Sequence, residues 1–304
     1  MPPRERPPRG TTPAGFRVQL LDRLRNRARE ENVEPRRLQN RIAFERLLAR
    51  IVEGDHWILK GGFALELRYG WRHRPTKDID LRTESPLADA LNRLREVLSR
   101  GQTIQQQDHF SFDLGEPGPE MQGAPGGAWR IPVTARVAGD VFTTFHIDLS
   151  SGDAVVQAPD VREGSDLLDF AGIPHVRFPV YPLPQQLAEK LHVYTLPRTK
   201  ENTRTKDLVD LLVIAAVETI DGTALTASVR ATFDARHTHL IPEALPPPER
   251  SWVQPFKRLA SEAPASPTTD LEAAFPRVEK FWMPVLQGIA DGLHWDPDAQ
   301  EWLG

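Results

Sequence analysis

The sequence contains no cysteine and no long apolar run. Without thiols, disulfides, zinc–thiolate sites and cysteine nucleophiles are all excluded. No apolar stretch approaches the roughly 20 residues that a membrane-spanning helix needs. The opening residues, MPPRER, also lack the apolar segment of a secretion signal. We therefore expect a cytoplasmic protein with no membrane partner.

The bulk composition is that of a soluble globular protein. Its 304 residues are 39% hydrophobic and 26% charged, which is enough to bury a sizeable core in one large domain or two. The 28 prolines cluster and so help to locate the loops. We find no internal repeat.

Charge is divided unevenly along the chain. Residues 1–50 carry 13 arginines, no lysine and six acids, a net charge of +7, whereas the remainder carries −11. A basic end on an acidic body can contact polyanions such as RNA. The alternatives are a solvated helix face or a mate for an acidic surface of the same protein.

Composition and periodicity predict three parts. Residues 1–13 are rich in proline, arginine and glycine and are expected to be a disordered basic tail. Residues 14–175 begin with two helical patterns and continue as mixed helices and strands, whereas residues 176–304 are predicted to be mainly helical. This order predicts an α+β fold in which N-terminal helices precede a mixed-sheet core and a helical C-terminal domain follows. Within it we expect helices at 16–31, 35–52, 63–69, 87–98, 183–195, 206–217 and 225–236, a long amphipathic run at 269–292, and strands at 57–60, 79–82, 109–114, 129–137, 142–149 and 176–182.

A glycine pair followed by two alternating aspartates is the most informative pattern. Gly61 and Gly62 lie between a predicted strand and a predicted helix, where backbone amides can approach a triphosphate closely. Asp78 and Asp80 are two residues apart in a predicted strand, so both carboxylates point to one face. The two carboxylates repel each other unless a cation lies between them. A Mg²⁺ or Mn²⁺ ion that also binds phosphate oxygens would compensate their charge.

A third acid is usual in a site of this kind, and Asp148 is the best candidate because it lies among apolar residues late in a predicted strand. Asp78, Asp80 and Asp148 are therefore the predicted metal ligands. The alternative is an edge strand with solvent-facing aspartates and a chance Gly-Gly turn. Either motif alone is weak, but the two in this order favour nucleotide chemistry.

A second group lies downstream. Asp207 and Asp210 are three residues apart in a predicted helix and so share a face, and Lys190 on the preceding helix can reach phosphate as a point charge. Asp207 could instead be an acid that simply favours the first turn of its helix. A run of cations beside the aspartates suits a metal–triphosphate site, although Arg74 could merely offset the acid pair. This run comprises Arg68, Arg72, Arg74 and Lys77.

In these segments the chain resembles the AbiEii/AbiGii nucleotidyltransferase toxins, which belong to the polymerase-β-like superfamily. The resemblance covers about residues 40–215 and follows the family's order of motifs. Those motifs are LKGGFAL at 59–65, RPTKDIDL at 74–81, EKLH at 189–192 and KDLVDL at 206–211. It implies a polymerase-β-like core, and a toxin that uses an NTP and Mg²⁺ to add nucleotides to RNA. Some relatives modify the 3′ end of tRNA and so block translation, and such toxins serve phage defence beside a cognate antitoxin.

The resemblance also implies roles for individual residues. Gly61 and Gly62 become the nucleotide-binding turn, and Asp78 and Asp80 become catalytic metal ligands. Lys60, Arg74 and Lys77 are predicted to bind the nucleotide together with this turn. The resemblance makes Lys190 a triphosphate contact, and Asp207 and Asp210 the acidic helix motif, one acid of which is required for activity. One position departs from the pattern, because many relatives have serine or threonine after the glycine pair where this chain has Phe63.

The function expected from the sequence is therefore Mg²⁺-dependent transfer of a nucleotide from an NTP to an RNA 3′ end, in particular the tRNA acceptor stem. One alternative is nucleotidyl or phosphoryl transfer to a protein, either the antitoxin or the chain itself. Another is a module that binds RNA or a partner without catalysis, although an intact and electrostatically costly acid pair argues against it.

Overall fold

Alternating apolar and polar residues in the first half of the chain build a mixed β-sheet with one apolar and one polar face. The computed structural model describes residues 12–52, 57–100, 108–121, 124–198 and 204–304. These residues form two compact units. Unit 1 comprises Met1–Leu67, Thr76–Gly152 and Val161–Val180, and unit 2 comprises Arg68–Pro75, Asp153–Asp160 and Tyr181–Gly304, each as far as described.

The sheet of unit 1 has the strand order β3-β4-β5-β2-β1-β7-β6 in the described residues. Strands β2 and β5 pair in parallel, as do β1 and β7, whereas β1–β2, β3–β4 and β4–β5 are antiparallel. The central strands therefore come from distant parts of the sequence. The bounds are β1 Ile58–Lys60, β2 Asp78–Thr83, β3 Phe110–Leu114, β4 Ala128–Val137, β5 Asp140–Ser151, β6 Asp160–Glu163 and β7 Arg177–Val180.

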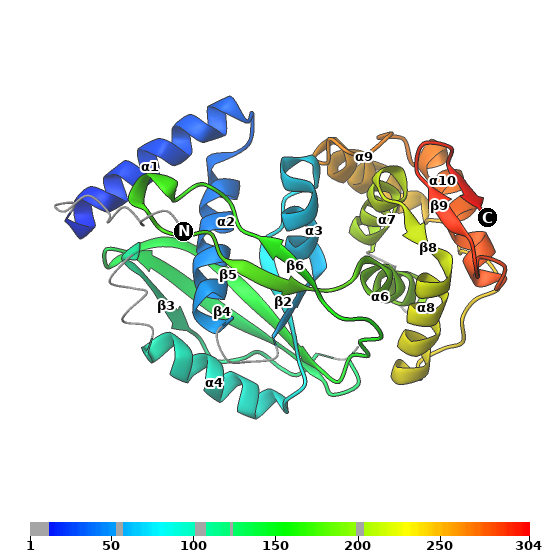
Figure 1. Ribbon diagram of the computed structural model, residues 1–304, viewed down its shortest axis with the longest axis horizontal. Helices are drawn as coiled ribbons and strands as arrows, with labels where there is room; N and C mark the ends of the chain where they lie inside the picture. The colour runs from blue at the N-terminus through cyan, green and yellow to red at the C-terminus, as the bar shows by residue number, and fades with distance from the viewer. Residues whose placement is uncertain (1–11, 53–56, 101–107, 122–123, 199–203) are drawn as a thin grey trace, which may run out of the picture. The chain divides into compact units, whose positions relative to one another are not determined.

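Helices cover the apolar face of this sheet. Helix α2 packs on β5, on α1 and on α4 (Figure 1). Its Phe44 ring lies edge-on to Phe145 of β5 and to Phe63 of α3, with centroids 4.8 Å and 5.0 Å apart. Thr12 caps α1 by accepting the amide of Gly15 at 3.1 Å. The bounds are α1 Pro13–Glu30, α2 Pro35–Ile51, α3 Gly61–Tyr69 and α4 Leu87–Arg100.

Buried ion pairs hold α2 in place. Arg46 and Arg50 both bond the carboxylate of Asp108, which has no exposed surface, at 2.7 Å and 2.8 Å. Nearer the start of the helix, Arg41 pairs with Glu45 at 3.0 Å. A buried carboxylate with two arginine partners is tolerated because its charge is compensated. These arginines of the basic N-terminal region therefore have structural partners inside unit 1.

Unit 2 is built mainly from helices, with a small antiparallel sheet of order β10-β9-β8 in its described part. Helices α6 and α8 pack together, and α10 contacts α7, α8 and α9. Trp295 of β9 is fully buried, and its indole N–H donates to the carbonyl of Ala215 at 2.7 Å. The bounds are α6 Leu183–Thr195, α7 Thr205–Val217, α8 Gly222–Arg236, α9 Val253–Ser261, α10 Leu271–Leu286, β8 Ile220–Asp221, β9 His294–Asp296 and β10 Glu301–Leu303.

The α+β class with a mixed sheet is as the sequence predicts, and the expected elements differ mainly at their ends. The predicted Gly-Gly turn is in fact the first turn of α3, which begins at Gly61. The short strands β6, β8, β9 and β10 and the helix α9 were not expected, because elements of this length carry little periodicity. Residues 1–11 of the predicted tail lie outside the described residues.

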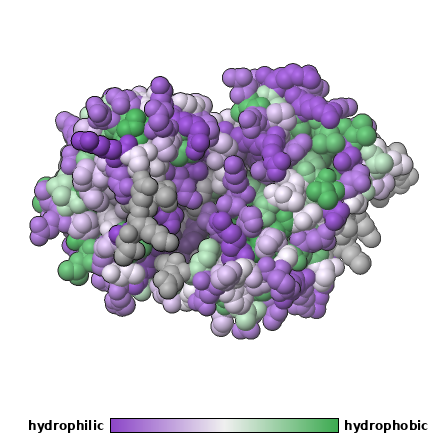
Figure 2. Space-filling view, turned by 180° about the vertical axis from the view of Figure 1, so that it is seen from behind, coloured by the Kyte–Doolittle hydropathy of each residue, from purple (hydrophilic) through white to green (hydrophobic). Residues whose placement is uncertain are grey.

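On the face drawn in Figure 2, hydrophilic residues cover much of the surface, and hydrophobic residues gather in patches between them. Among the helices in the described part of the chain, none is long and apolar enough to cross a bilayer.

Candidate active site

Three carboxylates lie on the polar face of the sheet in unit 1. Asp78 and Asp80 alternate with Ile79 and Leu81, whose side chains are buried on the other face. Asp148 of β5 is the direct register partner of Asp80. Residues paired across neighbouring strands point to the same side, so the predicted metal ligands come together on one face.

Charges of both signs form one row across four strands. Lys60 of β1 pairs in register with Asp80, Asp80 with Asp148, and Asp148 with Arg130 of β4. The row therefore has a cation at each end and two carboxylates in the middle. Asp78 belongs to the next row, where its partner is His146.

Arg130 joins the two rows. Its Nε and Nη2 donate to the two oxygens of Asp148 at 2.8 Å and 2.6 Å, and Nη2 lies 3.5 Å from Asp78 Oδ2. The hydrogen bond to Asp148 raises the pKa of the guanidinium, which stays charged. His146 Nδ1 lies 3.3 Å from Asp78 Oδ1. The side chains of Asp78 and Asp148 are 31% and 20% exposed, so a ligand from solvent can reach them.

Gly61 lies directly against Asp80. Its φ is +67°, and a Cβ placed there would lie 2.0 Å from Asp80 Oδ2. Only glycine allows this approach, because any side chain would displace the carboxylate. Helix α3 begins at this residue, and the first turn of a helix presents amide donors to anions.

The residues present fit a divalent cation by the chemistry of the donors. Carboxylate oxygens are the ligands that Mg²⁺ prefers, and Gly61 leaves the space that a Cβ would take from Asp80. Among the described residues, no three acidic or histidine side chains converge into a complete metal centre. The guanidinium of Arg130 bonds both Asp148 oxygens and reaches Asp78.

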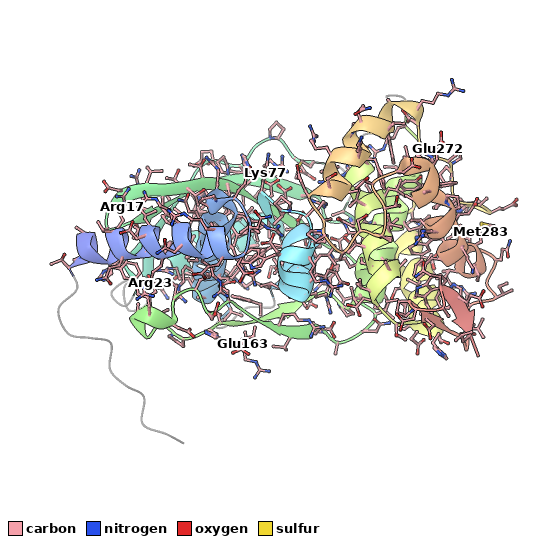
Figure 3. The ribbon with its side chains drawn as sticks, turned by 90° about the horizontal axis from the view of Figure 1, so that it is seen from above. Arg17, Arg23, Lys77, Glu163, Glu272 and Met283 are labelled. Carbon is pink, nitrogen blue, oxygen red and sulfur yellow. The ribbon has the colours of Figure 1, made fainter. Side chains whose placement is uncertain are left out.

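Phe63 is a core residue. Its side chain is fully buried against Phe44, so this position supplies packing and no hydroxyl. Lys77, labelled in Figure 3, immediately precedes β2 and is exposed.

The second predicted group assembles inside unit 2 around Asp210. This carboxylate has no exposed surface and bonds Arg74 through both oxygens at 2.7 Å and 2.6 Å. Lys190 Nζ donates to Asp210 at 2.6 Å and to Asp207 at 3.2 Å. His73 Nε2 lies 3.0 Å from Asp210. The structure thus brings the three predicted residues of this motif together with Arg74 and His73.

Electrostatics fix the protonation states in this cluster. Burial by itself would raise the pKa of Asp210, but Arg74 and Lys190 hold it well below its usual value. Burial opposes the charge on Lys190, yet Asp210 and Asp207 raise the pKa of its ammonium. Burial lowers the pKa of His73. The cluster is therefore a network of charged groups beside a neutral imidazole.

Two arginines of the predicted run of cations bond groups other than Asp78 and Asp80. Arg68 bonds Asp160 and the carbonyl of Tyr181 and is almost fully buried. Arg74 offsets Asp210. Of the four, Arg68 and Arg74 thus have acidic partners within unit 2, whereas Asp148 and Asp78 of unit 1 are contacted by Arg130. Sequence reasoning missed Arg130 because nothing local marks which face of β4 meets Asp148.

Several arginines of α1 also have partners. Arg25 pairs with Asp22 at 2.8 Å and Arg27 with Glu31 at 3.0 Å. Arg17 lies 3.5 Å from Asp140, and Arg23 lies 4.5 Å from the ring centroid of Phe170 (both arginines are labelled in Figure 3). The interpretation of the basic region as a mate for acidic groups of the same protein thus accounts for Arg17, Arg25 and Arg27, whereas Arg23 lies over an aromatic ring.

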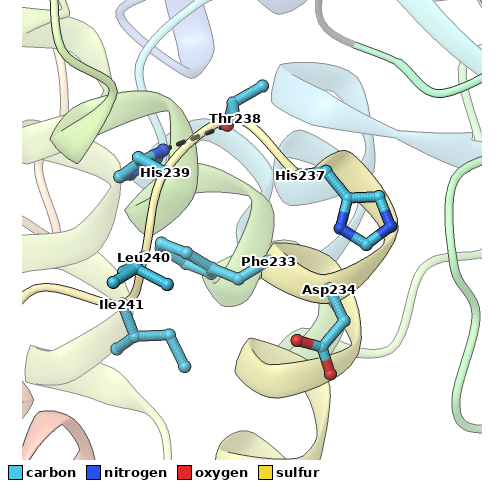
Figure 4. A pocket seen from close by; sticks show the side chains of 7 residues that line it. All are labelled: Phe233, Asp234, His237, Thr238, His239, Leu240 and Ile241. Atoms are coloured by element: carbon cyan, nitrogen blue, oxygen red, sulfur yellow. Dashed lines mark hydrogen bonds between the residues drawn. The ribbon is translucent and has the colours of Figure 1, made fainter.

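A pocket of about 530 Å³ in unit 2 lies apart from the predicted site residues (Figure 4). Thr238 bonds His239 at 3.0 Å on its wall, and Leu240 is 89% exposed there. Its lining consists of Phe233, Asp234, His237, Thr238, His239, Leu240 and Ile241.

Comparison with known proteins identifies the family. The family of the nucleotidyl transferase AbiEii toxin, of type IV toxin–antitoxin systems, matches residues 42–282. The solved structure of MenT4, a nucleotidyltransferase toxin from Mycobacterium tuberculosis, is 16% identical with a TM-score of 0.51, over 92% of this chain and 99% of that one. JHP933 from Helicobacter pylori is 14% identical with a TM-score of 0.45, over 84% and 94%. No curated protein sequence matches the chain.

The likeness to MenT4 establishes the nucleotidyltransferase fold. The family match spans most of the chain and includes both groups of predicted site residues. The chain belongs to the AbiEii nucleotidyltransferase toxin family of type IV toxin–antitoxin systems.

Proposed function

We propose that this toxin transfers a nucleoside monophosphate from an NTP to the 3′-hydroxyl of an RNA, namely the acceptor end of tRNA, and so stops translation. A bond forms between the 3′ oxygen and the α-phosphorus, the bond from the α-phosphorus to the bridging oxygen breaks, and pyrophosphate leaves. The observation that carries this proposal is the set of three carboxylates on one face of the sheet, one of which, Asp80, lies beside Gly61.

Each acid has a part in this proposal. Asp78, Asp80 and Asp148 would hold Mg²⁺ or Mn²⁺, which when bound neutralises phosphate charge and the leaving pyrophosphate. Asp148 is proposed to accept the proton of the 3′-hydroxyl and to release it to solvent. Asp80 lies against the backbone of Gly61, which brings the acids and the start of α3 into one site.

The nucleotide-binding part of the proposal rests on backbone and cations. The first turn of α3, at Gly61 and Gly62, would donate amides to the triphosphate. Lys60 stands in register beside Asp80 and would add positive charge near the same phosphates. Lys77 is exposed immediately before β2 and is proposed as a further phosphate contact.

In unit 2 we propose a positioning role for Lys190, Asp207 and Asp210. Lys190 has two carboxylate partners and a side chain only 10% exposed, so its ammonium is committed to the network. The network fixes Arg74, and the chain runs from Arg74 directly into β2 and Asp78.

A labelling experiment tests the proposal. Purified chain is incubated with Mg²⁺, total RNA containing tRNA, and each α-labelled NTP in turn, and the products are separated on a denaturing gel. Labelled tRNA is expected, and Asp80→Asn should reduce the label at least a hundredfold because a metal ligand is lost. The matched control is Asp113→Asn, which changes an exposed aspartate of the same sheet that pairs with Arg136 at 2.8 Å.

The location of the label decides between acceptors. Label on protein instead of RNA would show that the acceptor is a protein. Label that survives Asp80→Asn would show that the acid triad, Asp78, Asp80 and Asp148, is not needed for transfer. No label with any NTP, together with normal growth on expression, would favour a binding module.

A further inference from the structure

Arg130 is a basic side chain that bonds two acids of the proposed site. It bonds both oxygens of Asp148 and reaches Asp78, so one guanidinium touches two of the three proposed metal ligands. Bidentate charge-assisted bonds of this kind are among the stronger polar contacts in proteins. The guanidinium thus supplies positive charge where a divalent cation is proposed to bind.

We propose that Arg130 is the resident counter-ion of the acid triad and competes with the divalent cation for Asp78 and Asp148. The inference rests on the proposed function, because it takes these acids as the metal ligands. It goes beyond that function by assigning to this arginine control over the metal concentration at which the site fills.

The competition follows from the oxygens involved. Nε and Nη2 take one Asp148 oxygen each, at 2.8 Å and 2.6 Å, and a metal ion bound to either oxygen would lie within a few ångströms of a positive guanidinium. Two cations that close repel each other, so the metal can bind only as the guanidinium withdraws.

The position of Arg130 allows such a withdrawal. Its side chain is 45% exposed and bonds Asp148 and Asp78 at the surface of the sheet, so solvent can take over its hydrogen bonds. Arg46 and Arg50 differ, because they are buried around Asp108 and hold α2 in place. An exposed pair contributes little to stability, which makes removal of Arg130 compatible with an intact fold.

Metal binding measured without substrate tests the proposal. Mn²⁺ is titrated into the full chain in the absence of NTP, and free Mn²⁺ is followed by electron paramagnetic resonance. Arg130→Gln should bind Mn²⁺ about three- to fivefold more tightly than the parent chain, because a competing charge of this exposure is gone. Arg130→Lys keeps the charge but loses the bidentate bond, so its affinity should lie between the two.

Arg136→Gln is the matched control. Arg136 lies on the same strand, is 36% exposed and pairs with Asp113 at 2.8 Å, so its loss removes the same charge at a site remote from the triad in register. Its Mn²⁺ affinity should equal that of the parent chain. Thermal unfolding of every variant checks that the fold is intact.

Weaker Mn²⁺ binding by Arg130→Gln would overturn the proposal, because Arg130 would then hold the acids in place for the metal. Unchanged binding, or no binding by either protein, would also overturn it, because Arg130 would then be irrelevant to the metal. RNA labelling by the parent chain together with unchanged affinity would refute this inference alone. Tighter binding by Arg130→Gln that Asp80→Asn abolishes would support it even where no labelled RNA is found, and would leave the acceptor to be sought elsewhere.

Discussion

At the scale of single residues, the site depends on close contacts between charged side chains and on one glycine that leaves room for a carboxylate. Gly61 touches the carboxylate of Asp80, and Arg130 neutralises Asp148. The alternation of Asp78 and Asp80 could be predicted from the sequence, because strand geometry alone puts them on one face. The contact of Gly61 with Asp80 could not, because it depends on how β1 and β2 pair.

Replacement of Gly61 by alanine should reduce nucleotidyl transfer at least about tenfold. The new Cβ would meet Asp80 Oδ2 at 2.0 Å and Cγ at 2.4 Å, so the carboxylate must move away from its place in the triad. The left-handed backbone costs a further ~1–2 kcal/mol for a residue with a Cβ. RNA labelling and urea denaturation measure the two effects separately.

Gly139→Ala is the control for this change. Gly139 has φ of +87° with nothing within 4 Å of an added Cβ, so it incurs the backbone cost without a collision. Equal loss of transfer in both variants would show that contact with Asp80 is unimportant.

At the scale of elements, α2 is the helix that supports the sheet, and it does so through both apolar and ionic contacts. The helical periodicity over 35–52 predicts it correctly, because its apolar face repeats every three to four residues. Its arginines were interpreted from charge as a possible polyanion surface. The structure instead gives four of them acidic partners in unit 1, of which Glu45 lies on α2 itself, while the fold brings Glu66 and Asp108 to the helix. These partners could not be predicted, since Asp108 lies far along the chain from Arg46 and Arg50.

Asp108→Ala should lower the free energy of unfolding by about 3–5 kcal/mol, because it leaves Arg46 and Arg50 buried without their carboxylate. Urea denaturation followed by circular dichroism measures this loss. Asp22→Ala removes an exposed carboxylate from Arg25 on α1 and should change stability by less than about 0.5 kcal/mol. A small effect of Asp108→Ala would mean that water replaces the lost partner.

At the scale of the whole molecule, a buried histidine makes stability depend on pH. Unit 2 contains His192, which is buried beside Arg236 and His239. Burial, followed by the charge of Arg236 and the neighbouring His239, lowers the pKa of His192 to about 3, with Asp153 acting in the opposite direction. In the unfolded chain the same imidazole takes up a proton near pH 6.5.

Stability should therefore fall as the pH decreases below about 6.5 towards 3. In this window the unfolded state binds a proton that the folded state excludes, so the free energy of unfolding decreases. Between pH 7 and pH 5 the contribution from His192 is about 1–2 kcal/mol. Thermal unfolding at both values should show a smaller pH difference for His192→Gln than for the parent chain. His294→Gln, at an exposed residue of β9, should retain the full difference, and an equal response of the two variants would assign the effect to other groups.

The sequence by itself determined the α+β class, the order of the principal helices and strands, and the common face of Asp78 and Asp80. These features follow from local periodicity and strand alternation, which any stretch of chain carries within itself. Motif order also sufficed to indicate the AbiEii family, which the match over residues 42–282 confirms.

Only the tertiary structure decided which strands lie beside one another. The parallel pairing of β2 with β5 places Asp148 opposite Asp80, and the antiparallel pairing of β4 with β5 brings Arg130 to Asp148. Strand neighbours and register arise from the packing of distant segments around a shared core, so no local pattern specifies them. For the same reason Arg74 pairs with Asp210 and Arg130 neutralises the acids, although Arg74 lies nearer to Asp78 along the chain.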